Sequence, residues 1–149
     1  MKKKFKFYLI LITSILAFDN LSAVQSDTFS KGKLLFDNKD YEKSKFFFEK
    51  DIVFNPKSEN SYLYLAKIFN KKENDEEEEK NLDTVLLLNP KNDEAIYLLT
   101  LLKIKQSDYN EAKDLMEQFK SVCNLFCNKK NEMQKKFNKL IPENEKNKN

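Results

Sequence analysis

Two stretches of the sequence share one layout: residues 54–69 read FNPKSENSYLYLAKIF, and residues 88–103 read LNPKNDEAIYLLTLLK. The Asn-Pro pair near the start of each stretch recurs after thirty-four residues. An Asp-Tyr pair at 40–41 recurs at 108–109, which is two such periods later. Because two independent markers share one period and need no insertion, we predict an internal repeat.

Each period is predicted to be a helix–turn–helix unit. The residue before Pro avoids the α region, so a helix should end near each Asn-Pro pair. The Asp or Asn before the second helix of a unit can cap its free amides. Apolar side chains fall at i, i+3, i+4 and i+7 in the segment Tyr62, Leu65, Ala66 and Phe69, which is one helical face. With three Pro and one Gly, the chain is predicted to be all-α.

The repeat resembles the tetratricopeptide repeat (TPR) family, whose unit is thirty-four residues long. The family's small residue of the first helix falls on Gly32, Ala66 and Thr100. Its large apolar residue of the second helix falls on Phe48, Leu82 and Met116. Asp75 departs from the family's aromatic position, Glu78 from its second small position, and Asn124 from its Pro position.

The resemblance implies a solenoid of three TPR-like units and a capping helix. The units cover 25–58, 59–92 and 93–126, and the capping helix covers 127–141, where an apolar stripe with lysines around it suits the polar end of an array. The polar tail at 142–149 is predicted to be disordered.

The N-terminus has the order of a secretory signal peptide. Four lysines precede an apolar run at 7–18, and small residues follow at 22–23, so we predict a signal peptide at 1–23. The run is about twelve residues, short of the roughly twenty that cross a bilayer. Val24 stands where a bacterial lipobox has Cys, which excludes a lipid anchor there. These features predict an exported protein of bacterial type in the periplasm or cell envelope, with an uncleaved anchor as the alternative.

The composition excludes several kinds of chemistry. All 27 basic residues are lysines and there is no His, so there is no imidazole base or metal ligand and no guanidinium clamp. Without residues 1–23, the chain has 23 lysines and 23 acidic residues, which does not favour nucleic-acid binding. No nucleophile and base stand together, so we predict no enzyme activity, no cofactor and no metal.

Two further motifs have structural explanations. The acidic run at 73–79 lies at the start of a helix, where acids favour the helix dipole, and we expect it to be solvated. Cys123 and Cys127 are spaced unlike a zinc or redox CxxC motif. Two alternatives stay open for them: a disulfide that pins the turn where Pro is missing, or free buried thiols.

In the TPR family, the first helices of the units line a concave groove that binds partners. The resemblance therefore implies a partner-binding groove formed by Phe29, Lys33, Phe36, Leu63, Lys67, Asn70, Tyr97, Leu101 and Ile104. This groove would suit a peptide or a partner helix. The alternative is that several of these residues only contact the next helix. The predicted function is a non-catalytic scaffold or adaptor of the cell envelope. Two alternatives are a self-associating structural module and an accessory factor in outer-membrane protein or cell-wall assembly.

The signal-peptide prediction can be checked by the mass of the protein purified from its own cells. We expect the measured N-terminus to lie directly after Ala23, because the small residues at 22–23 suit the cleavage enzyme. A mass that retains Met1 or the lysines after it, in protein extracted from the membrane, would support the uncleaved anchor instead.

Overall fold

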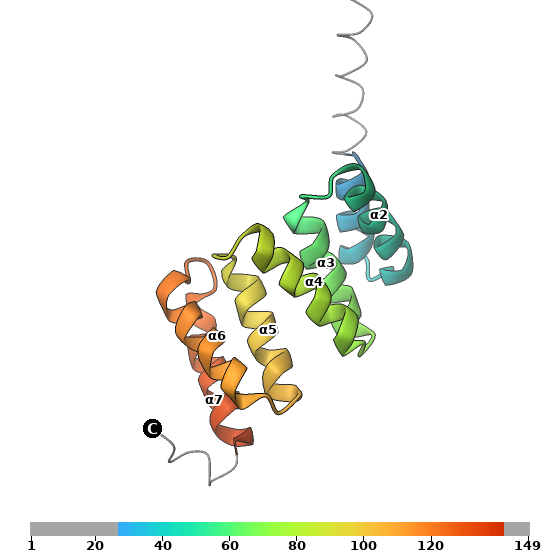
Figure 1. Ribbon diagram of the computed structural model, residues 1–149. Coiled ribbons are helices and arrows are strands. Elements are labelled where there is room, and N and C mark those ends of the chain that lie inside the picture. The colour runs from blue at the N-terminus through green and yellow to red at the C-terminus, as the bar shows by residue number, and fades with distance from the viewer. Residues whose placement is uncertain (1–26, 142–149) are drawn as a thin grey trace, which may run out of the picture. The chain divides into compact units, whose positions relative to one another are not determined.

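The computed structural model describes residues 27–141, which form α-helices joined by short turns and contain no β-strand (Figure 1). The all-α fold class is therefore confirmed for this part of the chain. The predicted signal peptide at 1–23 and the predicted tail at 142–149 lie outside the described residues. No helix within 27–141 has the length and apolar character that membrane crossing requires.

The chain divides into two compact units, Met1–Ser61 and Tyr62–Asn149, which we describe separately. The first unit contains a helix at 27–37, helix α2 (Tyr41–Phe54) and the first turn of helix α3 (Glu59–Lys71). The second contains the rest of α3 and four further α-helices. These are α4 (Asp75–Leu88), α5 (Asp93–Lys105), α6 (Tyr109–Val122) and α7 (Lys130–Leu140), with a short 3-10 helix, η1 (Cys127–Lys129), before α7.

The first unit is held by a close contact between Gly32 and Phe48. Phe48 is fully buried, and a Cβ added at Gly32 would lie 2.8 Å from its ring. Any larger residue at position 32 would therefore displace the ring. Ser44 Oγ donates a hydrogen bond of 2.8 Å to the Gly32 carbonyl, so the two small residues bring the helices together. Of the three consecutive phenylalanines, Phe48 enters the core while Phe46 is 60% exposed, as one helical face requires.

A buried carboxylate fixes the Asn-Pro turn of the first unit. Asp51 is 2% exposed, and its Oδ2 accepts hydrogen bonds from Ser58 Oγ at 2.6 Å and Ser61 Oγ at 2.5 Å. The backbone N–H of Asn55 caps the end of α2 by donating to the backbone carbonyl of Asp51 at 2.8 Å. The two hydroxyls satisfy the buried Asp51 oxygen and join the end of α2 to the start of α3.

In the second unit, α5 is the central helix and packs against α4, α6 and α7. Ala95 and Ile96 of α5 are fully buried, as are Leu82 of α4 and Phe119 of α6. Met133 and Phe137 attach one side of α7 to the same core. A helix that is surrounded on several sides must be apolar over most of its surface, which explains the run of apolar residues in α5.

The turns between paired helices share one backbone geometry that recurs with the period of thirty-four. Lys39, Glu73 and Ser107 adopt left-handed φ angles of 63°, 55° and 65°. The next residue in each case is an N-cap whose side chain accepts a hydrogen bond from the backbone N–H three residues later. These caps are Asp40, Asn74 and Asp108, at 3.3, 3.2 and 3.1 Å. The capping prediction is confirmed.

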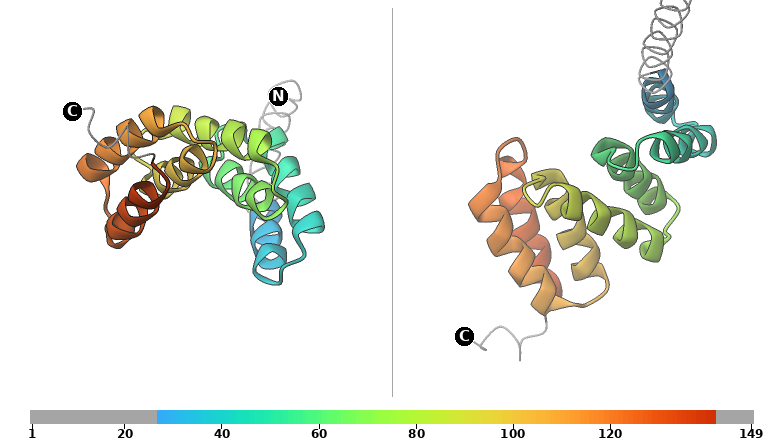
Figure 2. Two further views of the ribbon diagram at one scale, coloured as in Figure 1. Left: turned by 90° about the horizontal axis from the view of Figure 1, so that it is seen from below. Right: turned by 45° about the horizontal axis from the view of Figure 1, so that its top comes forward.

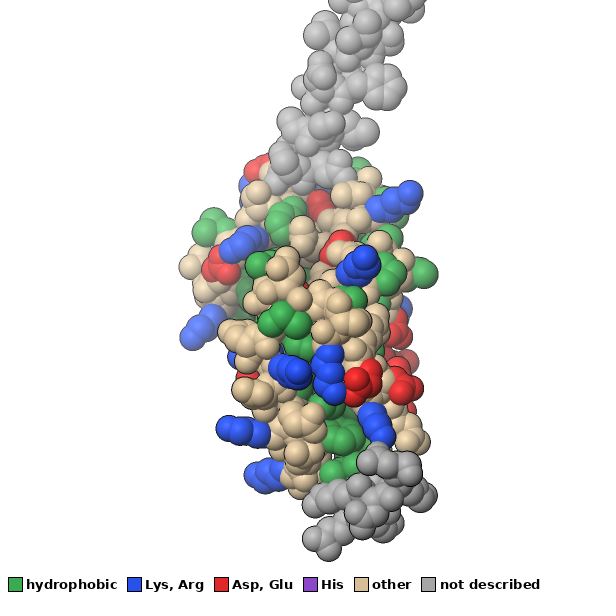
Figure 3. Space-filling model, turned by 90° about the vertical axis from the view of Figure 1, so that its left-hand side faces the viewer, with side chains coloured by type: hydrophobic (Ala, Val, Ile, Leu, Met, Phe, Trp, Pro, Cys, Tyr) green, Lys and Arg blue, Asp and Glu red, His purple; other side chains and the backbone are tan. Residues whose placement is uncertain are grey.

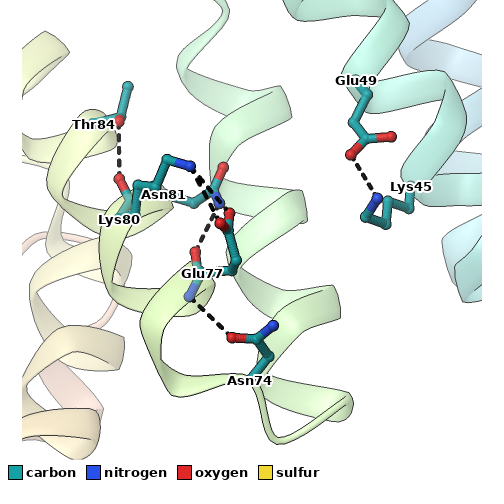
Figure 4. Close-up of polar contacts among 7 residues, drawn as sticks. All are labelled: Lys45, Glu49, Asn74, Glu77, Lys80, Asn81 and Thr84. Carbon is teal, nitrogen blue, oxygen red and sulfur yellow. Dashed lines mark hydrogen bonds and ion pairs between the residues drawn. The ribbon is translucent and has the colours of Figure 1, made fainter.

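After the Asn74 cap, further polar contacts form between neighbouring turns of α4 (Figure 4). Asn81 Nδ2 donates to the Glu77 carbonyl at 2.7 Å, and Lys80 Nζ lies 3.2 Å from Glu77 Oε1. Thr84 Oγ1 donates to the Lys80 carbonyl at 2.9 Å. Glu77 is therefore paired with a lysine of its own helix.

The expectation that the whole acidic run is solvated is wrong for one residue. Glu78 is 2% exposed, because it occupies the position that faces α3 and that a small residue fills in the TPR pattern. Asn70 Nδ2 lies 3.1 Å from both of its carboxylate oxygens and donates to them. Burial raises the pKa of Glu78, although the Asn70 amide opposes the shift.

The raised pKa gives Glu78→Gln a predictable effect on stability. A carboxyl whose pKa is raised by folding favours the folded state below its unfolded pKa, and this contribution is lost as the pH rises through the folded value. We expect Glu78→Gln to raise the free energy of unfolding, measured with urea, by about 1 kcal/mol at pH 7. At pH 4 the increase in the free energy of unfolding should be smaller. The control is Glu76→Gln, because Glu76 is exposed on the same helix. Equal behaviour of the two variants at both pH values would contradict the prediction.

Candidate functional site

The second unit arranges its helices on two sides. The left-hand view of Figure 2 shows α4 and α6 along one side of this unit, with α3, α5 and α7 along the other. The predicted groove positions of this unit lie on α3 and α5. We call the surface formed by Tyr64, Lys67, Asn70, Glu94 and Leu101 the α3–α5 face.

The predicted groove residues of the second unit differ in accessibility. Leu63, Tyr97 and Ile104 are 5%, 7% and 3% exposed and belong to the core. Their burial favours the alternative in which these positions contact neighbouring helices. Lys67 and Leu101 are half-buried, and Asn70 is exposed. A partner on this face would therefore contact Lys67, Asn70 and Leu101. The binding role of the six predicted groove residues of this unit stays a prediction.

The predicted groove residues of the first unit are Phe29, Lys33 and Phe36. The Phe29 ring lies 5.7 Å from the Phe48 ring, and the Phe36 ring lies 5.4 Å from the Tyr41 ring. Both phenylalanines are half-buried. Lys33 is exposed and pairs with Asp37, with its Nζ 2.6 Å from Oδ2. Two of the three positions therefore contribute aromatic packing to their own helix pair.

A partly buried ion pair lies at the centre of the α3–α5 face. Lys67 Nζ is 2.6 Å from Glu94 Oε1, and the two side chains are only 21% and 25% exposed. The same ammonium lies 4.7 Å from the centroid of the Tyr64 ring, which is a cation–π distance. Sequence reasoning found Lys67 but did not pair it with Glu94 or Tyr64, because no local pattern pairs residues from two repeats.

A second network joins α5 to α7. Tyr97 Oη donates to Glu132 Oε1 at 2.9 Å, and Lys129 and Lys136 lie 3.0 and 3.3 Å from the Glu132 carboxylate. The hydrogen bond from Lys129, followed by those from Tyr97 and Lys136, lowers the pKa of Glu132 to about 2. Burial and the bond to Glu132 raise the pKa of Tyr97 to about 12. The phenol therefore stays a hydrogen-bond donor across the physiological pH range.

The turn between α6 and α7 is closed by a disulfide and by a carboxylate. Cys123 and Cys127 are joined, with their Cα atoms 5.1 Å apart. Asp93, the first residue of α5, accepts hydrogen bonds through Oδ2 from the backbone N–H groups of Asn124 at 2.7 Å and Phe126 at 2.8 Å. The Phe126 ring lies 6.0 Å from the Tyr97 ring. These contacts replace the Asn-Pro turn of the earlier repeats.

Charged side chains also tie α4 and α6 to α5. Lys103 is 7% exposed, and its Nζ lies 2.6 Å from Glu79 Oε1 and 2.9 Å from Glu111 Oε2. Lys105 Nζ lies 2.5 Å from Asp75 Oδ1. Burial would lower the pKa of Lys103, but the two carboxylates outweigh it and raise the value. Much of the acidic run is thus neutralised within the unit.

Within residues 27–141, no group of His, Cys, Asp and Glu has an arrangement that could hold a metal ion. The charged side chains of the α3–α5 face are paired with one another, and Leu101 and Tyr64 supply apolar surface beside them. Such a surface can contact a polypeptide through its apolar parts while its ion pairs exchange partners.

Several solved structures with a similar fold are TPR domains. The first TPR of Spaghetti (RPAP3) bound to the HSP90 peptide SRMEEVD aligns with a TM-score of 0.69 and 16% identity, covering 78% of this chain and 92% of that chain. The Sgt2 TPR domain from Aspergillus fumigatus aligns with a TM-score of 0.65 and 16% identity, covering 77% and 80% of the two chains. The second TPR domain of human RPAP3, in complex with the HSP70 peptide SGPTIEEVD, aligns with a TM-score of 0.64 and 19% identity. This alignment covers 76% of this chain and 91% of that chain.

These similarities establish a TPR-like repeat fold for the chain. No protein-family model and no curated protein sequence matches it. At such identities the alignments show the fold alone.

The contacts of Asp93 predict which part of the second unit loses stability when Asp93 is substituted. Burial would raise the pKa of Asp93, but the backbone N–H groups of Phe126 and Asn124 bind the carboxylate and lower it overall. A depressed pKa stabilises the fold above the unfolded pKa of about 3.9, and this contribution is lost as the pH falls through the folded value. Asp93→Ala should therefore cost about 1–3 kcal/mol at pH 7.

Hydrogen exchange followed by mass spectrometry should show the loss of protection concentrated in α7. Asp93→Asn keeps one acceptor oxygen and should lose less, and Asp114→Ala is the control, since Asp114 is exposed on α6. If Asp93→Ala and Asp114→Ala exchange alike, the Asp93 carboxylate does not hold the turn.

Proposed function

We propose that the protein is a non-catalytic binding module that takes an extended peptide or a partner helix on its α3–α5 face. The observation that carries the proposal is the α3–α5 face itself. It combines an accessible apolar residue, Leu101, with the Lys67–Glu94 pair and Asn70, on the helices that correspond to the binding helices of TPR domains. A face of this kind offers apolar contact together with polar groups that can rearrange.

Two similar solved structures support the choice of ligand class. The first TPR of Spaghetti (RPAP3) holds an HSP90 peptide and the second TPR domain of human RPAP3 holds an HSP70 peptide. Both are polypeptide segments, and we transfer only this class to the present chain. Neither peptide is proposed as its ligand.

The proposal includes export and action in the cell envelope. Its support is the order of charge, apolar run and small residues at 1–23, together with the paired cysteines, which suit an oxidising compartment. Within the envelope the protein would act as a scaffold or adaptor for another protein.

Site-specific photo-crosslinking tests the binding face in living cells. A photoreactive phenylalanine analogue at Leu101 or Asn70 should give a discrete adduct with another protein, because both positions lie on the α3–α5 face. The same analogue at Lys113, which is exposed on α6, is the matched control. Substituting Leu63 or Tyr97 would be a poor test, since both are buried and their loss would unfold the core.

The identity of the adduct then decides the outcome. An adduct of one size at positions 101 and 70, absent at position 113 and found in the envelope fraction, supports the proposal. The proposal would be contradicted if adducts appear equally at all three positions. It would also be contradicted if the folded protein gives no adduct at positions 101 and 70.

A further inference from the structure

Several charges of the second unit are paired on the side of α4, whereas positive charge is in excess at α7. Three acids of the run are paired, Asp75 with Lys105, Glu77 with Lys80 and Glu79 with Lys103. Residues 120–141 contain lysines at 120, 129, 130, 135, 136 and 139 and a single acid, Glu132. The end of the unit therefore carries an excess of positive charge.

Within residues 27–141, only part of this excess is neutralised by acidic side chains. Glu132 pairs with Lys129 and Lys136, and Lys120 pairs with Glu117 at 2.6 Å. Lys135 and Lys139 are exposed and form no ion pair with any part of the chain that the structure describes. Uncompensated like charges on one helix repel each other, so a negative partner would stabilise them.

These lysines lie on one face of α7. Met133 and Phe137 point to the core, with exposures of 1% and 9%, and Phe137 stacks edge-on against Tyr109 at 6.2 Å. The opposite face carries the exposed side chains that we call the outer face of α7: Asn131, Lys135, Asn138 and Lys139.

The view in Figure 3, taken from the side on which α6 and α7 lie, shows lysine side chains spread over this end with hydrophobic side chains between them. No further helix covers α7 within the described residues, so the outer face is open there. Lysine ammonium groups supply positive charge and donors only, whereas the asparagine amides supply both donors and acceptors.

We propose that the outer face of α7 binds an acidic segment of a partner polypeptide through Lys135 and Lys139. Carboxylates are the natural acceptors for lysine ammonium and asparagine amide groups. Four residues along a helix span about 6 Å, and alternate residues of an extended chain are about 6.8 Å apart. A segment with acidic residues at every second position therefore matches the two lysines.

Two other anionic partners fit the surface less well. The chain without residues 1–23 has equal numbers of lysines and acids, whereas nucleic-acid binding usually needs a basic excess over the domain. The lysines occupy one short helix that interleaves them with asparagines, so they do not form the continuous basic and apolar stripe of a membrane-surface helix. Both partners are outcomes of the test.

Fluorescence anisotropy with a defined probe tests the proposal. The probe is a fluorescein-labelled, C-terminally amidated peptide of about ten residues in which Glu alternates with Ser, so that no terminal carboxylate takes part. We expect saturable binding at low salt that weakens as salt is added, because exposed charges are screened. The same peptide with Gln in place of Glu should not bind.

The variant pair Lys135→Glu with Lys139→Glu should weaken binding by roughly tenfold or more, since it turns attraction into repulsion. The matched control is Lys91→Glu with Lys113→Glu, which changes the net charge equally at two exposed lysines that are not part of α7. Hydrogen exchange of α7 in each variant confirms that the helix is still formed.

Binding lost in the α7 variant and retained in the control supports the proposal. Equal loss in both variants means that net charge alone attracts the peptide, and it overturns the proposal. It is also overturned if oligothymidylate or phosphatidylglycerol vesicles bind the outer face while the acidic peptide does not. The proposal uses no residue of the α3–α5 face, so it stands or fails separately from the crosslinks at Leu101.

Discussion

The turn between two paired helices is the constraint on which the repeat depends. At Lys39, Glu73 and Ser107 the backbone enters the left-handed region, and an Asp or Asn cap follows at once. A left-handed residue closes the end of the first helix, and the cap satisfies the free amides of the second. Together they reverse the chain in very few residues, so paired helices must run antiparallel and share one contact face.

The contact face then decides which side chains the pair can hold. The first unit fills it with Gly32 and Phe48 at a distance that excludes any larger residue at position 32. The second unit keeps Ala66 on α3 but places Glu78 on α4, where a small residue would be expected, and Asn70 becomes the partner of that carboxylate. The same backbone thus accommodates a buried acid by supplying an amide from the end of the preceding helix.

The period, the helix ends and the caps could be predicted because they depend on local chemistry. Asn-Pro pairs and Asp or Asn caps act within a few residues of themselves. The left-handed turns could not be predicted, since Lys39, Glu73 and Ser107 are not the Gly or Asn that usually mark such a conformation. For the candidate site, position in the repeat identified Lys67 and Leu101. It could not identify Glu94 as the partner of Lys67, or show that Leu63, Tyr97 and Ile104 are buried, because both facts depend on packing between repeats.

The last repeat shows how a departure from the pattern is compensated. Asn124 stands where the earlier repeats have Pro, and the turn is instead held by the Cys123–Cys127 disulfide and by the Asp93 carboxylate. Both devices are local to the junction, so they fix where α7 begins without using its surface. The core side of α7 is then anchored by Met133 and Phe137, and its charge is only partly neutralised through Glu132. Because neither the turn nor the core requires Lys135 or Lys139, the stability of the fold places no demand on these two charges, and their chemistry is free to serve binding.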